Sequence, residues 1–219
     1  MSENAVIDPV TMQIVGNALA SIADEMATTI FRTAHSTVVR DGMDFSAALC
    51  DARGETVAQA VTVPFHLGSV PVAMDHLLAK WGDKMRPGDV FVMNDPFDGG
   101  IHLQDIFIFR PVFYEETLIG FATTTAHHGD VGGRLPGSAA CDNTEIFQEG
   151  IRVPPIRLYE KGVLRRDMLD LMLCNVRDAD DRMGDIRAHV GCLRLGERRV
   201  LEIAARHGAP TLRYAIDDL

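Results

Sequence analysis

The most strand-like part of this sequence is residues 106–125, which read IFIFRPVFYEETLIGFATTT. β-Branched and aromatic side chains dominate both halves of it, as is typical of strands. Glu115-Glu116 separates the halves and is short enough to form a hairpin turn. The stretch therefore predicts a hairpin in which Ile106–Phe109 and Val112–Tyr114 pair with Leu118–Thr125.

Shorter strand patterns precede this hairpin along the chain. Phe45–Cys50 is a short apolar run, Asp51-Ala52-Arg53-Gly54 is a turn sequence with Gly at its end, and Glu55–Val61 returns. Val90–Met93 follows the turn Arg86-Pro87-Gly88-Asp89. These patterns predict a second hairpin and one further strand.

A helix is expected near the N-terminus. Asp8 is a suitable N-cap, and Pro9 suits the first turn. Within residues 9–34 the apolar side chains recur at spacings of three and four, which places them on one helical face. These residues are Val15, Leu19, Ile22, Met26 and Ile30.

Further helices are expected later in the chain. Residues 66–81 have helical character and end near Gly82. Met168–Asn175 and Asp185–His207 show helical periodicity, and Gly208 is a suitable C-cap.

The order of elements predicts the fold class. We expect an α+β protein with a mixed sheet of short hairpin-connected strands, an N-terminal helix and C-terminal helices. No strong domain boundary is visible. Residues 127–155 are irregular, and the stretch 130–165 is where we expect the chain to cross between subregions.

Composition excludes several classes of protein. With 47% hydrophobic and 24% charged residues among 219, the chain is globular rather than disordered. Its 21 basic and 31 acidic residues argue against a nucleic-acid binder. No apolar run approaches the ~20 residues of a membrane span. The polar N-terminus lacks a signal-peptide pattern, and the four cysteines form no CxxC pair, so we expect reduced thiols and a cytoplasmic location.

Residues with useful chemistry gather in three short segments, 40–46, 94–105 and 127–130. His102 and Asp105 are three residues apart and share a side if the segment is a turn, which Gly99-Gly100 would permit. His127 follows the partner strand of the hairpin, so it returns close to His102. Asp44, just before the first strand, is a candidate fourth ligand.

Two imidazoles and two carboxylates suit a divalent ion such as Zn²⁺, Mn²⁺ or Fe²⁺. Such an ion would polarise a carbonyl group or lower the pKa of bound water toward ~7. The HxxD spacing alone is weak evidence, because such residues also serve as buried hydrogen-bonded histidines, caps and turns. A Ser46, His66 and Asp75 triad is possible on paper, but no GxSxG motif supports it. No phosphate-binding glycine loop is visible.

Several motifs together resemble one family, over about residues 8–207. In their order, the sequence is similar to the hydantoinase B/oxoprolinase family. The motifs are Asp44-Phe45-Ser46, Pro64-Phe65-His66-Leu67-Gly68-Ser69, the segment 94–105, Ala126-His127-His128-Gly129-Asp130-Val131-Gly132-Gly133, Glu145-Ile146-Phe147-Gln148-Glu149-Gly150, Asn175-Val176-Arg177 and Gly184-Asp185-Ile186-Arg187-Ala188.

The resemblance implies a division of labour between two kinds of subunit. ATP is bound by a separate A-type subunit, which phosphorylates an amide or carbonyl oxygen, and the B-type subunit carries out the next step at a divalent metal. The family's metal ligands map onto Asp44, His102, Asp105 and His127. Beside them, we interpret Asp41, Asp95 and His128 as residues that orient ligands or carry protons.

The resemblance implies a B-type subunit of an ATP-dependent cyclic amide hydrolase, of the N-methylhydantoinase or 5-oxoprolinase kind. Mn, Zn or Fe is the expected metal, and the A-type subunit would use the ATP. Two alternatives stay open: a subunit of an ATP-dependent acetone or acetophenone carboxylase, and a truncated non-catalytic paralogue. The B-type subunits of the family are more than twice this length, so residues 1–219 correspond to their N-terminal part. A second polypeptide is a possible source of the rest.

Overall fold

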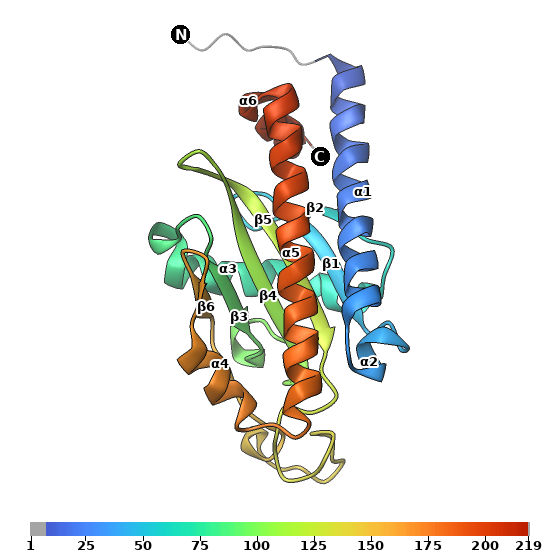
Figure 1. The fold of residues 1–219 in the computed structure, drawn as a ribbon, viewed down its shortest axis with the longest axis vertical. Helices are drawn as coiled ribbons and strands as arrows, with labels where there is room; N and C mark the ends of the chain where they lie inside the picture. The colour runs from blue at the N-terminus through green and yellow to red at the C-terminus, as the bar shows by residue number, and fades with distance from the viewer. Residues whose placement is uncertain (1–7, 219) are drawn as a thin grey trace.

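The computed structural model describes residues 8–218 and contains three layers (Figure 1). A seven-stranded sheet, in the order β2-β1-β5-β4-β3-β6-β7, forms the middle layer. Two long helices, α1 and α5, lie side by side across one face, and α3 covers the other. The elements are α1 (Pro9–Thr33), α2 (Thr37–Arg40), β1 (Phe45–Cys50), β2 (Thr56–Gln59), α3 (Val70–Trp81), β3 (Val90–Met93), β4 (Asp105–Tyr114), β5 (Thr117–His127), β6 (Ile156–Glu160), β7 (Val163–Leu164), α4 (Arg166–Leu173), α5 (Ala179–His207) and α6 (Ala209–Asp218), with 3-10 helices at Pro64–Ser69, Gly82–Lys84, Pro96–Asp98 and Ile146–Gln148.

The predicted hairpin is present as β4 and β5, and it lies in the middle of the sheet. Its strands pair from Asp105 with His127 to Tyr114 with Thr117, and the turn is Glu115-Glu116. Alternate side chains of β4 face opposite layers, because successive residues of a strand point to opposite sides. Ile106 and Ile108 join the core under α1 and α5, whereas Phe107 and Phe109 pack against α3. Burial on both faces explains why the strand is apolar almost throughout.

The two long helices hold one side of this core. Asp8 caps α1 by accepting hydrogen bonds from the backbone N–H groups of Val10 and Thr11. The five apolar residues predicted on one face of α1 are all buried. Against them lies α5, which approaches closely at Gly196: a Cβ there would lie 2.5 Å from Met26 Sδ.

The predicted α+β class is confirmed, although the sheet is antiparallel in every described pairing rather than mixed. Short turns or loops join β1 to β2, β3 to β4, β4 to β5 and β6 to β7, and such short connections impose antiparallel order. The helix expected from residue 66 begins at Val70 instead. A 3-10 helix occupies Pro64–Ser69, because Pro71 suits only the first turn of a helix.

Four helices and strands of the structure were not predicted. They are α2, β6 with its short partner β7, and α6 after Gly208. In the stretch 130–165, where we expected the chain to cross between subregions, a long irregular segment leads back to the sheet as β6, which pairs with β3. The polar segment at the N-terminus that entered the localisation argument lies largely outside the described residues.

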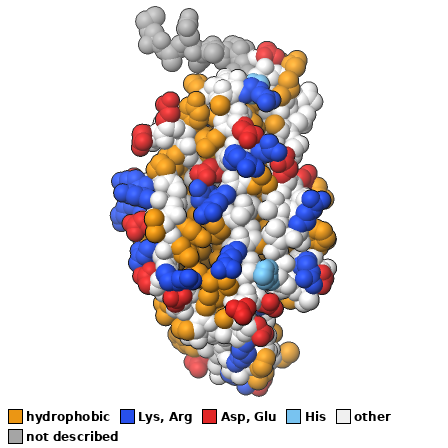
Figure 2. Space-filling model, viewed as in Figure 1, with side chains coloured by type: hydrophobic (Ala, Val, Ile, Leu, Met, Phe, Trp, Pro, Cys, Tyr) orange, Lys and Arg blue, Asp and Glu red, His pale blue; other side chains and the backbone are white. Residues whose placement is uncertain are grey.

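The outer surface of α1 and α5 carries both charge signs. Lys and Arg are interspersed with Asp and Glu over this face, without one dominant patch (Figure 2). Between residues 8 and 218, no helix is both long and apolar enough to cross a bilayer.

Candidate metal centre

Strand register brings the candidate ligands to one end of the sheet, the lower end in Figure 1. Phe45, the first residue of β1, pairs with Ala126 near the end of β5, and Asp105, the first residue of β4, pairs with His127. The backbone N–H of His127 also donates to the carbonyl oxygen of Asp44, at 2.9 Å. Asp44, Asp105 and His127 therefore meet where three neighbouring strands begin or end.

His102 joins them through a tight turn. The Asp105 backbone N–H donates to the His102 carbonyl at 3.0 Å, and the His102 N–H donates to Asp105 Oδ2 at 3.0 Å. The preceding Gly99 has φ 99°, and a Cβ there would lie 2.5 Å from Ala73 N in α3. The loop can pass this close to α3 only because residue 99 lacks a side chain.

Asp105 contacts both histidines of the site through its carboxylate. It is fully buried, and its Oδ1 lies 2.7 Å from His127 Nδ1 while its Oδ2 lies 3.0 Å from His102 Nδ1. Burial raises the pKa of the Asp105 carboxyl, but the contacts with the His127 and His66 side chains and the hydrogen bond from the His102 backbone outweigh this effect and hold the pKa well below its ordinary value. The same hydrogen bond to Asp105 raises the pKa of His127. The carboxylate is thus ionised at neutral pH.

These atoms have the spacing of a ligand set. One ligand atom from each of His102, Asp105 and His127 lies within 4.8 Å of the others. Asp44 is not part of this group of three, but its Oδ1 lies 3.6 Å from His66 Nε2, as does Asp105 Oδ1. Imidazole nitrogens and carboxylate oxygens suit Zn²⁺, Mn²⁺ or Fe²⁺, so the residues present fit a divalent ion.

The site opens to solvent on one side. The side chains of His102 and Asp44 are 57% and 40% exposed, in contrast to the buried Asp105. Phe65, itself exposed, stacks on His102 with ring centroids 6.0 Å apart. A substrate therefore has access to the histidine face, with an aromatic ring at its edge.

The structure does not bring the three proposed proton carriers into this cluster. Asp41 lies at the surface and pairs with Arg40. Asp95 is buried, receives the Phe97 N–H and pairs with Arg152. His128 is fully buried, and its ring stacks on His189 of α5. Their roles remain predictions.

His66 is the residue that sequence reasoning missed in this cluster. Ser46 and His66 do meet, with Ser46 Oγ 3.2 Å from His66 Nδ1, but Asp44 and Asp105 face the ring, and Asp75 is exposed on α3. Ser46 is also buried and donates its proton to the Val63 carbonyl, so it is no exposed nucleophile. The Pro64–Ser69 motif was the available signal, but the position of its histidine depends on packing across β1.

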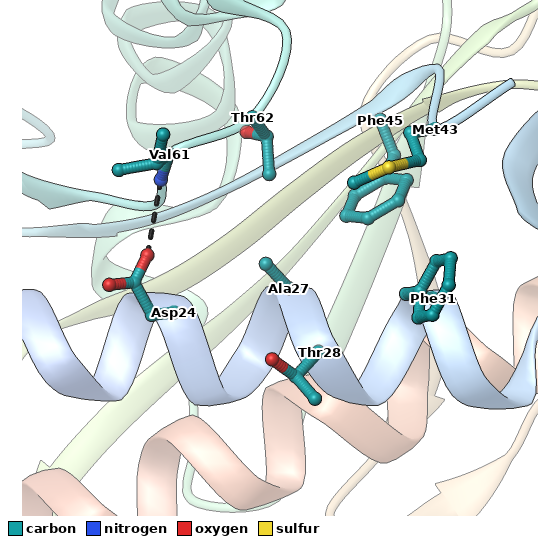
Figure 3. A pocket seen from close by; sticks show the side chains of 8 residues that line it. All are labelled: Asp24, Ala27, Thr28, Phe31, Met43, Phe45, Val61 and Thr62. Atoms are coloured by element: carbon teal, nitrogen blue, oxygen red, sulfur yellow. Dashed lines mark hydrogen bonds between the residues drawn. The ribbon is translucent and has the colours of Figure 1, made fainter.

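A separate groove of about 360 Å³ lies beside α1 (Figure 3). Met43 and Phe45, the two neighbours of Asp44, face Phe31 of α1 across it. Of its lining residues only Asp24 is ionisable, and this carboxylate accepts the Val61 N–H. The groove is mainly apolar and shares no side chain with the ligand cluster.

The family follows from a comparison with known proteins. A profile described as hydantoinase B/oxoprolinase matches residues 8–219. The chain belongs to this family. The beta subunit of the caprolactamase of Pseudomonas jessenii is 36% identical over 97% of this chain and 37% of its own length. The B-type subunit of a putative D-/L-hydantoinase of Pseudomonas sp. (strain NS671) is 34% identical, with the same coverage of 97% and 37%.

Solved structures agree on the fold of this family member. The ATP-dependent caprolactamase from Pseudomonas jessenii matches with a TM-score of 0.89 and 34% identity, over 97% of this chain and 37% of that chain. Nucleotide-free acetone carboxylase matches with a TM-score of 0.89 and 23% identity, over 95% of this chain and 28% of that chain. At 23% identity the likeness concerns the fold alone. This hydantoinase B/oxoprolinase chain spans little more than a third of the length of these two curated relatives.

Proposed function

We propose that this chain is the metal-binding part of a B-type subunit in an ATP-dependent amide hydrolase acting on cyclic amides. The observation that carries the proposal is the cluster of His102, Asp105 and His127, whose ligand atoms lie within 4.8 Å of one another. Relatives named as caprolactamase, hydantoinase and 5-oxoprolinase support the amide substrate class.

Asp44, His102, Asp105 and His127 would hold the ion, which is Mn, Zn or Fe. The ion would supply Lewis acidity and lower the pKa of bound water. Asp105 orients both imidazoles, because its two oxygens contact one ring each. The exposed faces of His102 and Asp44 leave the approach open to substrate, and Phe65 limits water on one side of His102.

Partner subunits belong to the same proposal. The caprolactamase and hydantoinase relatives are each named as one subunit of an enzyme, which supports a second, A-type subunit here. ATP dependence of the caprolactamase supports phosphorylation of the substrate in that partner. A phosphorylated amide oxygen is a better leaving group than the amide oxygen itself. A polypeptide equivalent to the rest of the relatives would complete the assembly. A cytoplasmic location fits the four free thiols, Cys50, Cys141, Cys174 and Cys192.

Metal content of the purified protein tests the site first. We expect about one divalent ion per chain, lost in His102→Ala and His127→Ala and retained in His207→Ala, a control in the last turn of α5. Absence of metal from a folded parent protein would contradict the site.

An activity assay then tests the reaction. The chain is combined with an A-type subunit and with a polypeptide equivalent to the part of the relatives that this chain does not cover. ATP and either 5-oxoproline or hydantoin are then added. We expect a ring-opened product that requires ATP and disappears in His127→Ala. A metal-loaded complex without turnover would support the non-catalytic paralogue, and incorporation of labelled bicarbonate into a ketone would support the carboxylase.

A further inference from the structure

The centre contains an additional imidazole, that of His66, which the ligand set inferred from the sequence leaves out. His66 lies in the 3-10 helix Pro64–Ser69, and its side chain is 2% exposed. Its Nε2 faces two carboxylate oxygens, Asp44 Oδ1 and Asp105 Oδ1, each at 3.6 Å. A buried polar ring therefore points into the candidate metal centre.

The hydrogen bonds of Ser46 fix which nitrogen of His66 carries a proton. The Ser46 hydroxyl has a single proton and donates it to the Val63 carbonyl oxygen at 2.6 Å. Toward His66 Nδ1, at 3.2 Å, Ser46 Oγ can then only accept, so Nδ1 carries a hydrogen. In a neutral imidazole this leaves the Nε2 lone pair free and aimed at the two carboxylates.

A lone pair beside two carboxylate oxygens is repulsive unless a metal ion, or a proton on Nε2 that both carboxylates accept, lies among them. At 3.6 Å both contacts exceed the usual hydrogen-bond range of about 2.7–3.2 Å. Ligand atoms that share an ion at about 2.0–2.2 Å lie roughly 3.0–3.5 Å apart, close to what is observed. The arrangement fits coordination better than direct contact.

We propose that His66 is a further ligand of the same divalent ion, bound through Nε2, and that Ser46 is the residue that holds its ring in the required tautomer. The inference rests on the metal site of the proposed function. It changes the set to three histidines and two carboxylates: Asp105 of β4, His127 of β5, Asp44 just before β1, His102 just before β4, and His66 of the 3-10 helix. A metal-bound histidine commonly donates its other N–H to a fixed acceptor, which here is Ser46 Oγ.

Nuclear magnetic resonance of the ¹⁵N-histidine-labelled protein tests this directly. The His66 signals are assigned by their loss in His66→Gln. On addition of Zn²⁺ we expect the Nε2 resonance of His66 to move to the range of a coordinated nitrogen while Nδ1 keeps its proton. If zinc binds and Nε2 carries a proton, His66 only bridges the carboxylates, and the inference is overturned while the metal site stands.

Zinc affinity, measured by competition with a chelator, provides a second readout. We expect His66→Gln to raise the Kd at least tenfold and Ser46→Ala to raise it about tenfold, as is typical when a group that orients a ligand is lost. His207→Gln should leave the Kd unchanged. An unchanged Kd in His66→Gln would overturn the assignment of His66 alone, and a parent protein that binds none of Zn²⁺, Mn²⁺ and Fe²⁺ would overturn the proposed function with it.

Discussion

At the scale of single residues, Asp105 organises the candidate centre. Replacing it with Asn retains the shape of the side chain but removes its charge and one of the two acceptors that contact His102 and His127. We expect Asp105→Asn to weaken zinc binding by about 100-fold or more, measured by chelator competition. Asp75→Asn, on the exposed side of α3, is the matched control and should bind zinc like the parent. Equal affinities in the two variants would contradict a central role for Asp105.

The residues of this cluster differ in how far sequence could place them. His102 and Asp105 share a three-residue spacing beside Gly99-Gly100, so their proximity is a local property that sequence can indicate. The position of His127 requires a second inference, because it depends on the register of the hairpin that pairs it with Asp105. His66 could not be placed, because its ring reaches Asp105 only after the 3-10 helix packs beside Ser46 of β1.

A buried polar group between α5 and the end of β5 predicts a pH dependence. His189 is fully buried, and burial lowers its pKa to about 4 despite the opposing charge of Asp185. Thr124 of β5 and His128, the residue after β5, face it, and Asp185 and Arg182 lie near it on α5. The folded protein therefore favours the neutral His189 ring, whereas the unfolded chain takes up a proton near pH 6.5.

These two pKa values determine whether the free energy of unfolding rises or falls with pH. The contribution of His189 to stability is fully present above pH 6.5 and is lost as the pH falls toward 4. His189→Gln should reduce the slope of unfolding free energy against pH in this window by about 1.4 kcal/mol per pH unit. Urea unfolding at several pH values measures the slope, with His207→Gln as the control. Identical slopes in the parent and His189→Gln would refute the prediction.

At the scale of elements, the approach of α5 to α1 and β5 depends on Gly196. A Cβ there would lie 2.5 Å from Met26 Sδ and 3.3 Å from Ala122 Cβ. Gly191, in the same helix, is exposed and has nothing within 4 Å of its Cβ position. The two glycines therefore differ in packing but not in secondary structure.

Opposite effects are expected when each becomes alanine. Gly196→Ala should lower the free energy of unfolding by about 1–3 kcal/mol through overpacking. Gly191→Ala should raise it by about 0.5–1 kcal/mol, because alanine favours the helix. Urea denaturation checks both, and Met26→Ala combined with Gly196→Ala should destabilise by less than the sum of the two single changes. The same sign in both single variants would show that helix propensity outweighs packing here.

The elements themselves show where local sequence suffices. Phe45–Cys50 and Val90–Met93 are strands with the predicted bounds, because their apolar runs lie between clear turns. α2 is only four residues long, too short for periodicity, and the Asp185 carboxylate of α5 accepts the backbone N–H groups of His35 and Ser36 before it. β6 is half-buried and is defined by pairing with β3, a contact between distant parts of the chain.

At the scale of the whole molecule, the sheet joins two apolar clusters, one against α1 and α5 and the other against α3. The candidate ligands lie at one end of this sheet and come from β4, β5 and the segments that precede β1 and β4. An ion bound there would link elements that are distant in the sequence. Because the ligand atoms are assembled only in the folded state, ion binding should stabilise the whole fold.

Calorimetric unfolding with and without Zn²⁺ measures this linkage. With free zinc at about 100 times its Kd, the folded state gains about 2.7 kcal/mol, provided that the unfolded chain binds none. For a chain of this size that corresponds to a rise in Tm of roughly 5–10 °C. His127→Ala should lose most of the rise, and His207→Ala should keep it. An equal rise in both variants would place the ion elsewhere, whereas loss confined to His127→Ala ties the stability of the whole sheet to the end where β1, β4 and β5 meet.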